Sequence, residues 1–173
     1  MRIAVLSDTH VGQQLSVFPT EFLRRLLDFD AIIHCGDYTA SETVDMLNEA
    51  SSSFFGVRGN MDDEKIRNHL PEEIIIELGG IKVAVTHGWG APNGLAEKVL
   101  EKIREKYPTK KPDIILFGHT HIPSNQTIDG IRVINPGAVS GNVNSVSGTW
   151  GVLEIENGEV KWHLEQIPQA GYY

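Results

Sequence analysis

Short runs of apolar and β-branched residues recur through the first two thirds of the chain. Gly, Asp, Asn and Ser residues bound these runs, which is typical of buried strands. Three longer segments, 21–29, 42–50 and 94–107, carry apolar residues at positions i, i+3 and i+4 and predict amphipathic helices. The predicted strands are residues 3–6, 31–35, 54–57, 74–78, 81–85 and 114–117.

Cap and turn residues indicate where helices begin and where strands are joined by hairpins. Ser41 and Asn93 stand at the start of two predicted helices and are predicted to be their N-caps. The chain therefore begins with βα units and adds antiparallel hairpins later, which predicts an α/β fold of packed sheets covered by helices. The two-residue hairpin turns are predicted at Gly79-Gly80, Asp129-Gly130 and Asn157-Gly158.

Length and composition agree with one compact domain over residues 1–173. A chain of 173 residues, 40% of them hydrophobic, can bury a sizeable core. The first apolar run is too short for a secretory signal, and no stretch approaches the ~20 apolar residues of a membrane span. We therefore expect a cytoplasmic protein without a membrane partner. The one cysteine, Cys35, excludes an internal disulfide and a thiolate metal cage.

The charge balance disfavours a protein that binds long nucleic acid. The net charge is −8, from 15 basic and 23 acidic residues, whereas binding to a phosphate backbone needs an excess of cations. The densest basic stretch, residues 101–111, alternates lysines with glutamates at helical spacing. This pattern favours a solvated helix face.

Side chains that can bind metals follow five of the predicted strands, and four of these strand ends also carry a glycine. In open α/β sheets, sites form in the crevice beyond the carboxyl ends of the strands, so these side chains are expected to converge. A single residue of this kind after a strand is more often an ordinary turn residue. That all of these residues lie at strand ends is hard to explain by chance. The candidates are Asp8, His10, Asp37, Asn60, His87, His119 and His121.

Four imidazoles, two carboxylates and one amide oxygen form a nitrogen and oxygen set that suits Mn, Fe, Ni, Zn or Co. Seven ligands are too many for one tetrahedral ion, but they suffice for two ions if one carboxylate bridges. Two divalent ions, two aspartates and a hydroxide leave about one positive charge, which matches a phosphodiester anion. The adjacent glycines would leave room beside the bulky ligands.

Other histidines, the cysteine and one tryptophan have simpler interpretations. His34 lies within an apolar strand and is predicted to be a core residue or to support a ligand. His69 and His163 are predicted to be surface or packing residues, and Cys35 a small core residue. Trp89 follows a candidate ligand and either lines a pocket or packs.

The order and spacing of the candidate ligands resemble the calcineurin-like metallophosphoesterase superfamily, and the small size resembles its YfcE-like single-domain phosphodiesterases. The resemblance implies two facing mixed β-sheets flanked by helices, a four-layer α/β/β/α fold. It also implies two divalent ions, with manganese as the expected ion and nickel, iron, cobalt, zinc or magnesium as substitutes. The motifs are Asp8-x-His10, Gly36-Asp37, Gly59-Asn60, His87 and Gly118-His119-x-His121.

The resemblance further assigns a role to each ligand. The first metal would be held by Asp8, His10 and His121, with Asp37 as the bridge to the second. Asn60, His87 and His119 would hold the second metal, and Asp37, Asn60 and His87 are the residues predicted to be catalytic. A metal-bridging hydroxide would attack a small phosphodiester substrate.

Two departures from the family pattern bear on the substrate. The superfamily usually has a histidine after Gly-Asn, whereas this chain has Met61, which cannot donate a proton to a leaving group. Asp62 could replace it as an acid, but the favoured interpretation is a residue at the start of a helix. The second departure follows the Asn135-Pro136-Gly137 turn, where relatives often carry an arginine. Residues 141–145 contain no cation, and this loop rich in Gly, Asn and Ser is expected to be mobile.

Three alternatives remain open. A non-catalytic scaffold, like the retromer subunit that shares this fold and also lacks the histidine, would have no physical need for all seven ligands. A nuclease or a phosphomonoesterase acting on nucleotides would use the same ions. Homo-oligomer formation is possible in each case.

Overall fold

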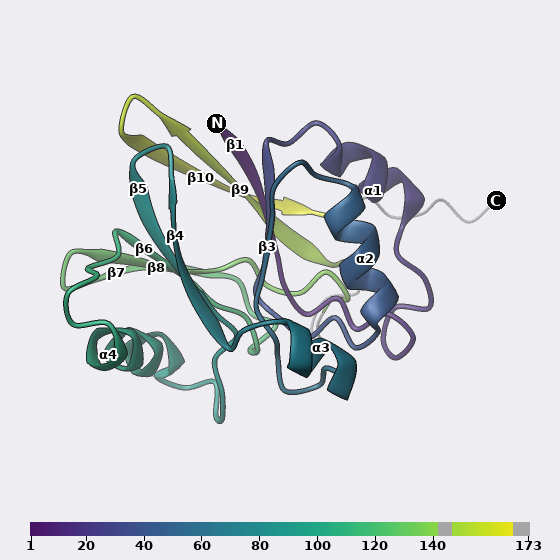
Figure 1. Cartoon of the computed structure of the whole chain (residues 1–173), viewed down its shortest axis with the longest axis horizontal. Helices are drawn as coiled ribbons and strands as arrows, with labels where there is room; N and C mark the ends of the chain where they lie inside the picture. The colour runs from purple at the N-terminus through teal and green to yellow at the C-terminus, as the bar shows by residue number, and fades with distance from the viewer. Residues whose placement is uncertain (142–146, 168–173) are drawn as a thin grey trace.

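The computed structural model describes residues 1–141 and 147–167, which contain four helices and ten strands (Figure 1). The strands form two five-stranded mixed sheets that face each other. The helices are α1 (Thr20–Leu26), α2 (Ser41–Glu49), α3 (Glu64–His69) and α4 (Leu95–Lys106). The strands are β1 (Arg2–Leu6), β2 (Ala31–His34), β3 (Phe54–Gly56), β4 (Glu73–Leu78), β5 (Ile81–Thr86), β6 (Ile114–Leu116), β7 (Ser124–Ile128), β8 (Ile131–Asn135), β9 (Thr149–Glu156) and β10 (Glu159–Gln166).

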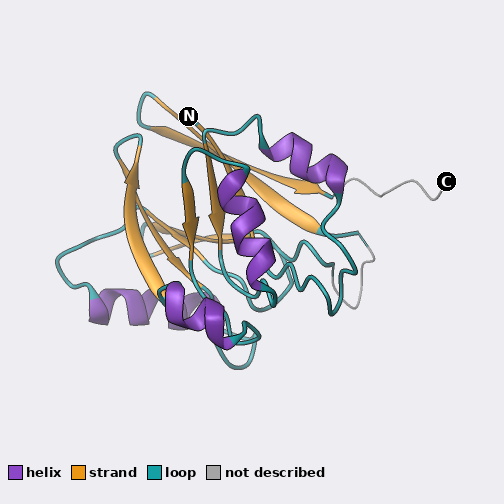
Figure 2. Ribbon diagram, turned by 45° about the vertical axis from the view of Figure 1, so that its right-hand side comes forward, coloured by secondary structure: helices purple, strands orange, loops and turns teal. Residues whose placement is uncertain are grey.

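The first sheet has the order β10-β9-β1-β2-β3. Strands β1, β2 and β3 are parallel, and β1 also pairs with β9 in the antiparallel direction. Helices α1 and α2 cover the outer face of this sheet, where Phe22, Leu26 and Leu47 pack around the buried Trp150 (Figure 2). The parallel core of this sheet comes from the βα units that the sequence pattern predicts.

The second sheet has the order β4-β5-β6-β8-β7. Strands β5, β6 and β8 are parallel, and hairpins add β4 and β7 at the two edges. The amphipathic helix α4 packs its Val99, Leu100 and Ile103 against Ile115 of β6 and Val133 of β8. The second sheet therefore has its parallel strands at the centre, whereas in the first sheet they extend to the edge strand β3, and both sheets carry helices on their outer faces.

A third hydrophobic cluster fills the space between the two sheets. Ile3 and Val5 of β1 point into it, while the alternate residues Ala4 and Leu6 point to the helix side, as the period of two along a strand requires. Val85 of β5 meets them from the second sheet. The four-layer α/β/β/α arrangement is thereby confirmed.

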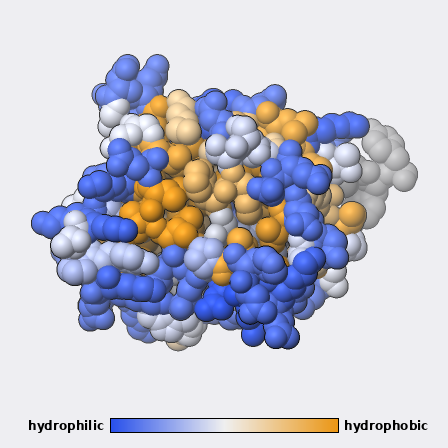
Figure 3. Space-filling view, viewed as in Figure 1, coloured by the Kyte–Doolittle hydropathy of each residue, from blue (hydrophilic) through white to orange (hydrophobic). Residues whose placement is uncertain are grey.

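The two edge strands β3 and β4 lie on the same side of the molecule, where this inner cluster approaches the surface. Figure 3 shows apolar side chains exposed on this face between hydrophilic ones. Phe55 of β3 and Ile74 and Ile76 of β4 are partly buried and pack against the inner cluster. The contact between the two sheets thus extends to their edges.

The predicted hairpin turns are confirmed, but both predicted N-caps are wrong. Residues Asp129 and Gly130 have φ angles of 49° and 79°, and the other two turns are likewise positive at both positions. Helix α2 begins at Ser41 itself, whose hydroxyl accepts a hydrogen bond from Lys65 instead of capping. Helix α4 is preceded by Gly94 with a φ of 68°, so Asn93 lies outside it. No helix of the described residues is both long and apolar enough to cross a membrane.

Candidate metal centre

The carboxyl ends of β1, β2, β3, β5 and β6 meet at one end of the two sheets, as the sequence predicts. Asp8 and His10 follow β1, Asp37 follows β2 and Asn60 follows β3, all in the first sheet. The second sheet contributes the rest, from the loops after β5 and β6. The structure brings all seven candidates together, with none displaced: Asp8, His10, Asp37, Asn60, His87, His119 and His121.

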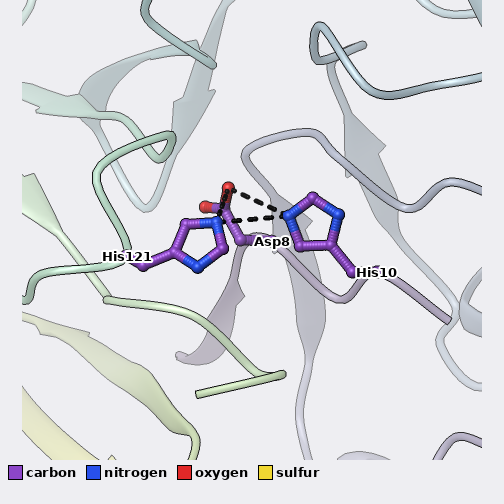
Figure 4. Close-up of side chains that lie close together, drawn as sticks. All are labelled: Asp8, His10 and His121. Carbon is purple, nitrogen blue, oxygen red and sulfur yellow. Dashed lines mark hydrogen bonds and ion pairs between the residues drawn. The ribbon is translucent and has the colours of Figure 1, made fainter. Parts of the chain in front are cut away.

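Asp8, His10 and His121 form the first half of this cluster. The imidazoles of His10 and His121 approach the Asp8 carboxylate from two sides (Figure 4). Asp8 Oδ1 lies 3.1 Å from His121 Nε2 and 3.8 Å from His10 Nε2, and the two imidazole nitrogens are 3.2 Å apart. Three ligand atoms thus point at a common position, as the ligands of one ion must.

Asn60, His87 and His119 form the second half around an amide oxygen. Asn60 Oδ1 lies 3.1 Å from His87 Nε2 and 2.9 Å from His119 Nδ1. His87 Nε2 is also 3.2 Å from Asp37 Oδ2. One carboxylate oxygen, one amide oxygen and two imidazole nitrogens therefore converge on a second position.

Asp37 lies between the two halves. Its Oδ2 atom is 3.8 Å from His10 Nε2 in the first half and 3.2 Å from His87 Nε2 in the second. The other oxygen, Oδ1, accepts a hydrogen bond from the backbone N–H of Met61 at 2.7 Å. This bond fixes the carboxylate so that Oδ2 faces both halves.

The chemistry of the donor set fits divalent cations. Asp8 and Asp37 are both buried, and among the described residues Asp8 Oδ1 faces only the imidazoles of His121 and His10, which are themselves candidate ligands. A buried carboxylate is costly unless a positive charge neutralises it, and neutral imidazoles that bind an ion would leave this role to the ion. The oxygen and imidazole donors around it match Mn, Fe, Co, Ni or Zn.

In His87 and His119, the ring nitrogen that faces away from the cluster is held by a backbone carbonyl. His87 Nδ1 donates to Cys35 O at 2.7 Å, and His119 Nε2 donates to Gly90 O at 2.8 Å. Hydrogen bonds of this kind fix the tautomer of a metal-binding histidine and leave its other nitrogen for the ion. These two histidines are therefore oriented before any ion binds.

Charges and hydrogen bonds within the cluster shift the pKa values of its aspartates and of His87. Burial alone would raise the pKa of Asp8, but hydrogen bonds and charges of His10, His121 and His87 hold it well below its usual range. Burial likewise opposes ionisation of Asp37, and its contact with His87 lowers its pKa. For His87, burial is outweighed by Asp37 and Asp8, which raise its pKa to about 9. The protein without metal thus keeps both carboxylates charged.

Glycines beside the ligands are required by close contacts. A Cβ atom on Gly118 would lie 1.9 Å from Ser7 Oγ and 2.7 Å from Asp8 Oδ2. A Cβ atom on Gly59 would lie 2.1 Å from Asp37 Oδ1. The expectation that these glycines leave room for ligands is therefore confirmed.

Asp62 has a role that the sequence interpretation missed. Its buried carboxylate accepts hydrogen bonds from the backbone N–H groups of Asp37, Tyr38, Thr39 and Gly59, at 2.6 to 3.2 Å. It thereby connects the loop after β2 to the loop after β3. The prediction that Asp62 starts a helix is wrong, because the next residue, Asp63, caps α3 through a hydrogen bond to Ile66 N.

The remaining predictions for single residues are mostly confirmed. His34 is fully buried, contacts Thr9 Oγ1 and stacks on Tyr38, and burial lowers its pKa to about 3. Cys35 is a core residue, and burial raises the pKa of its thiol. His69 and His163 are on the surface. Of the loop 141–145 that lacks an arginine, residues 142–145 lie outside the described residues.

A pocket of about 430 Å³ opens beside the second half of the cluster. Asn60 and His87 form one wall of this pocket, and Trp89 lines it as well. Trp89 is 42% exposed, which favours the pocket-wall interpretation over packing. Met61, the residue after Asn60, is also exposed and offers no proton.

Comparison with known proteins gives a consistent result. Residues 1–158 match the calcineurin-like phosphoesterase superfamily domain. The probable metallophosphoesterase MJ0623 of Methanocaldococcus jannaschii is 34% identical over 80% of this chain and 68% of its own. Phosphodiesterase MJ0936 of the same organism is 25% identical over 93% of this chain and 97% of its own.

Two solved structures are similar to this one over 96% of the chain. Protein TM1076 of Thermotoga maritima has a TM-score of 0.77 and 36% identity, with 99% of its chain covered. Vps29 of Entamoeba histolytica, solved in complex with Zn²⁺, has a TM-score of 0.73 and 23% identity, with 99% of its chain covered. At that identity the Vps29 likeness shows the fold alone.

Proposed function

Because the chain belongs to the calcineurin-like phosphoesterase superfamily, we propose that it is a phosphodiesterase that works with two divalent metal ions. The substrate is a small phosphodiester, and the seven clustered side chains are the metal ligands. Manganese is the ion we expect, with nickel, iron, cobalt, zinc or magnesium as substitutes. The proposed location is the cytoplasm.

The shared position of Asp37 is the observation that carries this proposal. One carboxylate oxygen faces a histidine of each half, at 3.8 Å and 3.2 Å. A single-ion site would not need a second group of ligands on the far side of this carboxylate. Asp37 therefore suits the role of a bridge, with Asp8, His10 and His121 on one side and Asn60, His87 and His119 on the other.

Two bound ions would supply a hydroxide nucleophile at neutral pH and stabilise the charge on the phosphate oxygens. The chain's own residues set the geometry for this chemistry. Met61 N–H orients Asp37, and the carbonyls of Cys35 and Gly90 orient His87 and His119. Three of the ligands are less buried than the two aspartates, namely Asn60, His119 and His121. A substrate would therefore approach the ions from the side of these three residues.

Several observations favour a phosphodiester over a phosphomonoester. Two ions, two aspartates and one hydroxide leave about one positive charge, which matches a monoanion. Met61 cannot protonate a leaving group, so esters with acidic alcohols, such as aryl esters, should react fastest. Phosphodiesterase MJ0936, at 25% identity, has this activity in its name.

A scaffold without catalysis is the rival from another class, because Vps29 shares the fold. The two buried aspartates argue against it, since a pure scaffold would bear the cost of burying Asp8 and Asp37 side by side with the candidate histidine ligands for no purpose. A nuclease acting on long nucleic acid is disfavoured by the net charge of −8.

The proposal is tested by measuring hydrolysis of a diester, bis(p-nitrophenyl) phosphate, and of a monoester, p-nitrophenyl phosphate. Both rates are measured after chelation and again after each metal is added back. We expect the diester to be cleaved faster, and only with metal. Asp37→Ala should lower the diester rate at least about a hundredfold, because the bridging ligand is lost. Asp45→Ala, which removes an exposed aspartate from α2, is the matched control. Turnover without metal, or full activity of Asp37→Ala, would contradict the proposal.

A further inference from the structure

The pocket beside the metal ligands has a charge opposite to that of the whole protein. Its lining includes the cations Arg58, Arg67 and Lys102 and only one carboxylate, Glu72. The chain as a whole has a net charge of −8. A local excess of cations in an acidic protein, next to the candidate catalytic centre, indicates an anion-binding pocket.

The cations are only partly neutralised by the acidic groups around them. Arg58 lies 3.9 Å from Glu72, and Lys102 lies 2.9 Å from the same carboxylate and 3.1 Å from the buried Glu73. Arg67 donates to the carbonyl oxygens of Asp62 and Asn60, and within the described part of the chain no carboxylate is within 4.0 Å of its guanidinium. Among the described residues, the positive charge of Arg67 at the pocket is therefore not paired with a carboxylate.

Position links these cations to the reaction. The same Arg67 guanidinium that lines the pocket contacts the backbone of Asn60, whose side chain is a proposed metal ligand. Trp89 forms another wall, and the Lys102 ammonium lies 4.8 Å from the centre of its ring. This contact holds the ammonium at the pocket. A group bound in the pocket would thus lie next to a phosphate held at the metal centre, and both could belong to one substrate molecule.

We infer that this pocket binds a second phosphate group of the substrate, so that the preferred substrates are phosphodiesters that carry another phosphate near the scissile one. This inference rests on the proposed function, because the metal centre must hold the scissile phosphate. Arginine and lysine side chains are the groups that proteins use to bind phosphate. A volume of about 430 Å³ is within the range of small-molecule pockets.

Calorimetric titration with adenosine 3′,5′-bisphosphate and adenosine 5′-monophosphate tests the inference, since the two probes differ by one phosphate. Titrations use the manganese-loaded protein and the chelated protein. We expect the bisphosphate to bind at least about fivefold more tightly in both states. Equal affinity for the two probes in both states would overturn the inference.

Charge variants test the pocket with effects of opposite sign. Lys102→Gln and Arg58→Gln should each weaken bisphosphate binding about fivefold, while Glu72→Gln should strengthen it. Arg58→Gln is the second variant because Lys102→Gln also removes an ion pair of the buried Glu73, whereas Arg58 pairs with Glu72. Lys161→Gln, which removes a lysine from β10 outside the pocket, is the matched control. Equal losses in Lys102→Gln and Lys161→Gln would contradict the inference.

The same variants separate this inference from the proposed function. If no phosphodiester is cleaved but the bisphosphate preference follows the charge variants, the pocket is correct and the proposed activity is wrong. If diesters are cleaved while the variants leave both affinities unchanged, the activity stands and the pocket assignment is wrong.

Discussion

Five of the seven proposed ligands have a positive φ angle, from 47° at His10 to 70° at His119. Residues other than glycine rarely adopt this left-handed conformation, which costs about 1–3 kcal/mol each and is concentrated at functional sites. Here it directs side chains from short loops into one crevice. Residue type and strand position predicted which residues converge, but not this backbone conformation. The five are Asp8, His10, Asp37, His119 and His121.

Metal binding should depend on pH through His87. Its pKa of about 9 in the protein without metal means that it carries a proton at pH 7, and an ion can bind only the neutral ring. Affinity for manganese should therefore rise up to about tenfold per pH unit between pH 7 and 9. Calorimetry at pH 7.5 in two buffers of different ionisation enthalpy should show about one proton released per ion bound at this position. An affinity that does not change with pH would contradict this assignment.

The sequence predicts helices, strands and turns well where the pattern that specifies them lies within a few neighbouring residues. Strand ends and two-residue hairpins depend on neighbouring residues, so β1, β2 and the Asp129-Gly130 turn were found from the pattern. The N-caps failed because an extended Ala40 and a left-handed Gly94 set the helix starts. Asp62 was missed because its four backbone donors come from two loops, and their contact is not visible in the sequence.

Asp62 and Asp63 are adjacent aspartates with different expected effects. Asp62→Ala leaves buried N–H groups of two ligand loops without an acceptor, so it should lower the free energy of unfolding by about 3 kcal/mol or more and weaken manganese binding. Asp63→Ala removes only the cap of α3 and should cost about 1 kcal/mol with no change in metal affinity. Urea unfolding and manganese titration measure both effects. Similar metal affinities in the two variants would argue against the proposed role of Asp62.

At the scale of the whole molecule, strand order could not be read from the pattern. The C-terminal strands β9 and β10 return to pair beside β1, with Ile3 opposite Leu153. No local signal specifies a contact over that separation, and the expectation of two facing sheets came from the family resemblance. Because the two sheets face each other, each half of the metal centre takes ligands from both of them.

Ions bound at this position should therefore join the two sheets and stabilise the fold. At a free manganese concentration of about 100 times Kd, binding contributes about 2.7 kcal/mol, which corresponds to a rise in Tm of roughly 5–10 °C for a chain of this size. Differential scanning calorimetry with manganese and with excess chelator measures the shift. Calcium, which prefers all-oxygen ligands, is the control cation and should have a smaller effect. An unchanged Tm after chelation would contradict a metal centre between the sheets.

The most direct test of the central claim is anomalous diffraction from crystals grown with manganese. The account predicts two peaks about 3.5–4 Å apart, on either side of the Asp37 carboxylate. One peak should contact Asp8, and the other should contact Asn60. A pocket without peaks, or a single ion that does not touch Asp37, would contradict the claim that two ions share this carboxylate.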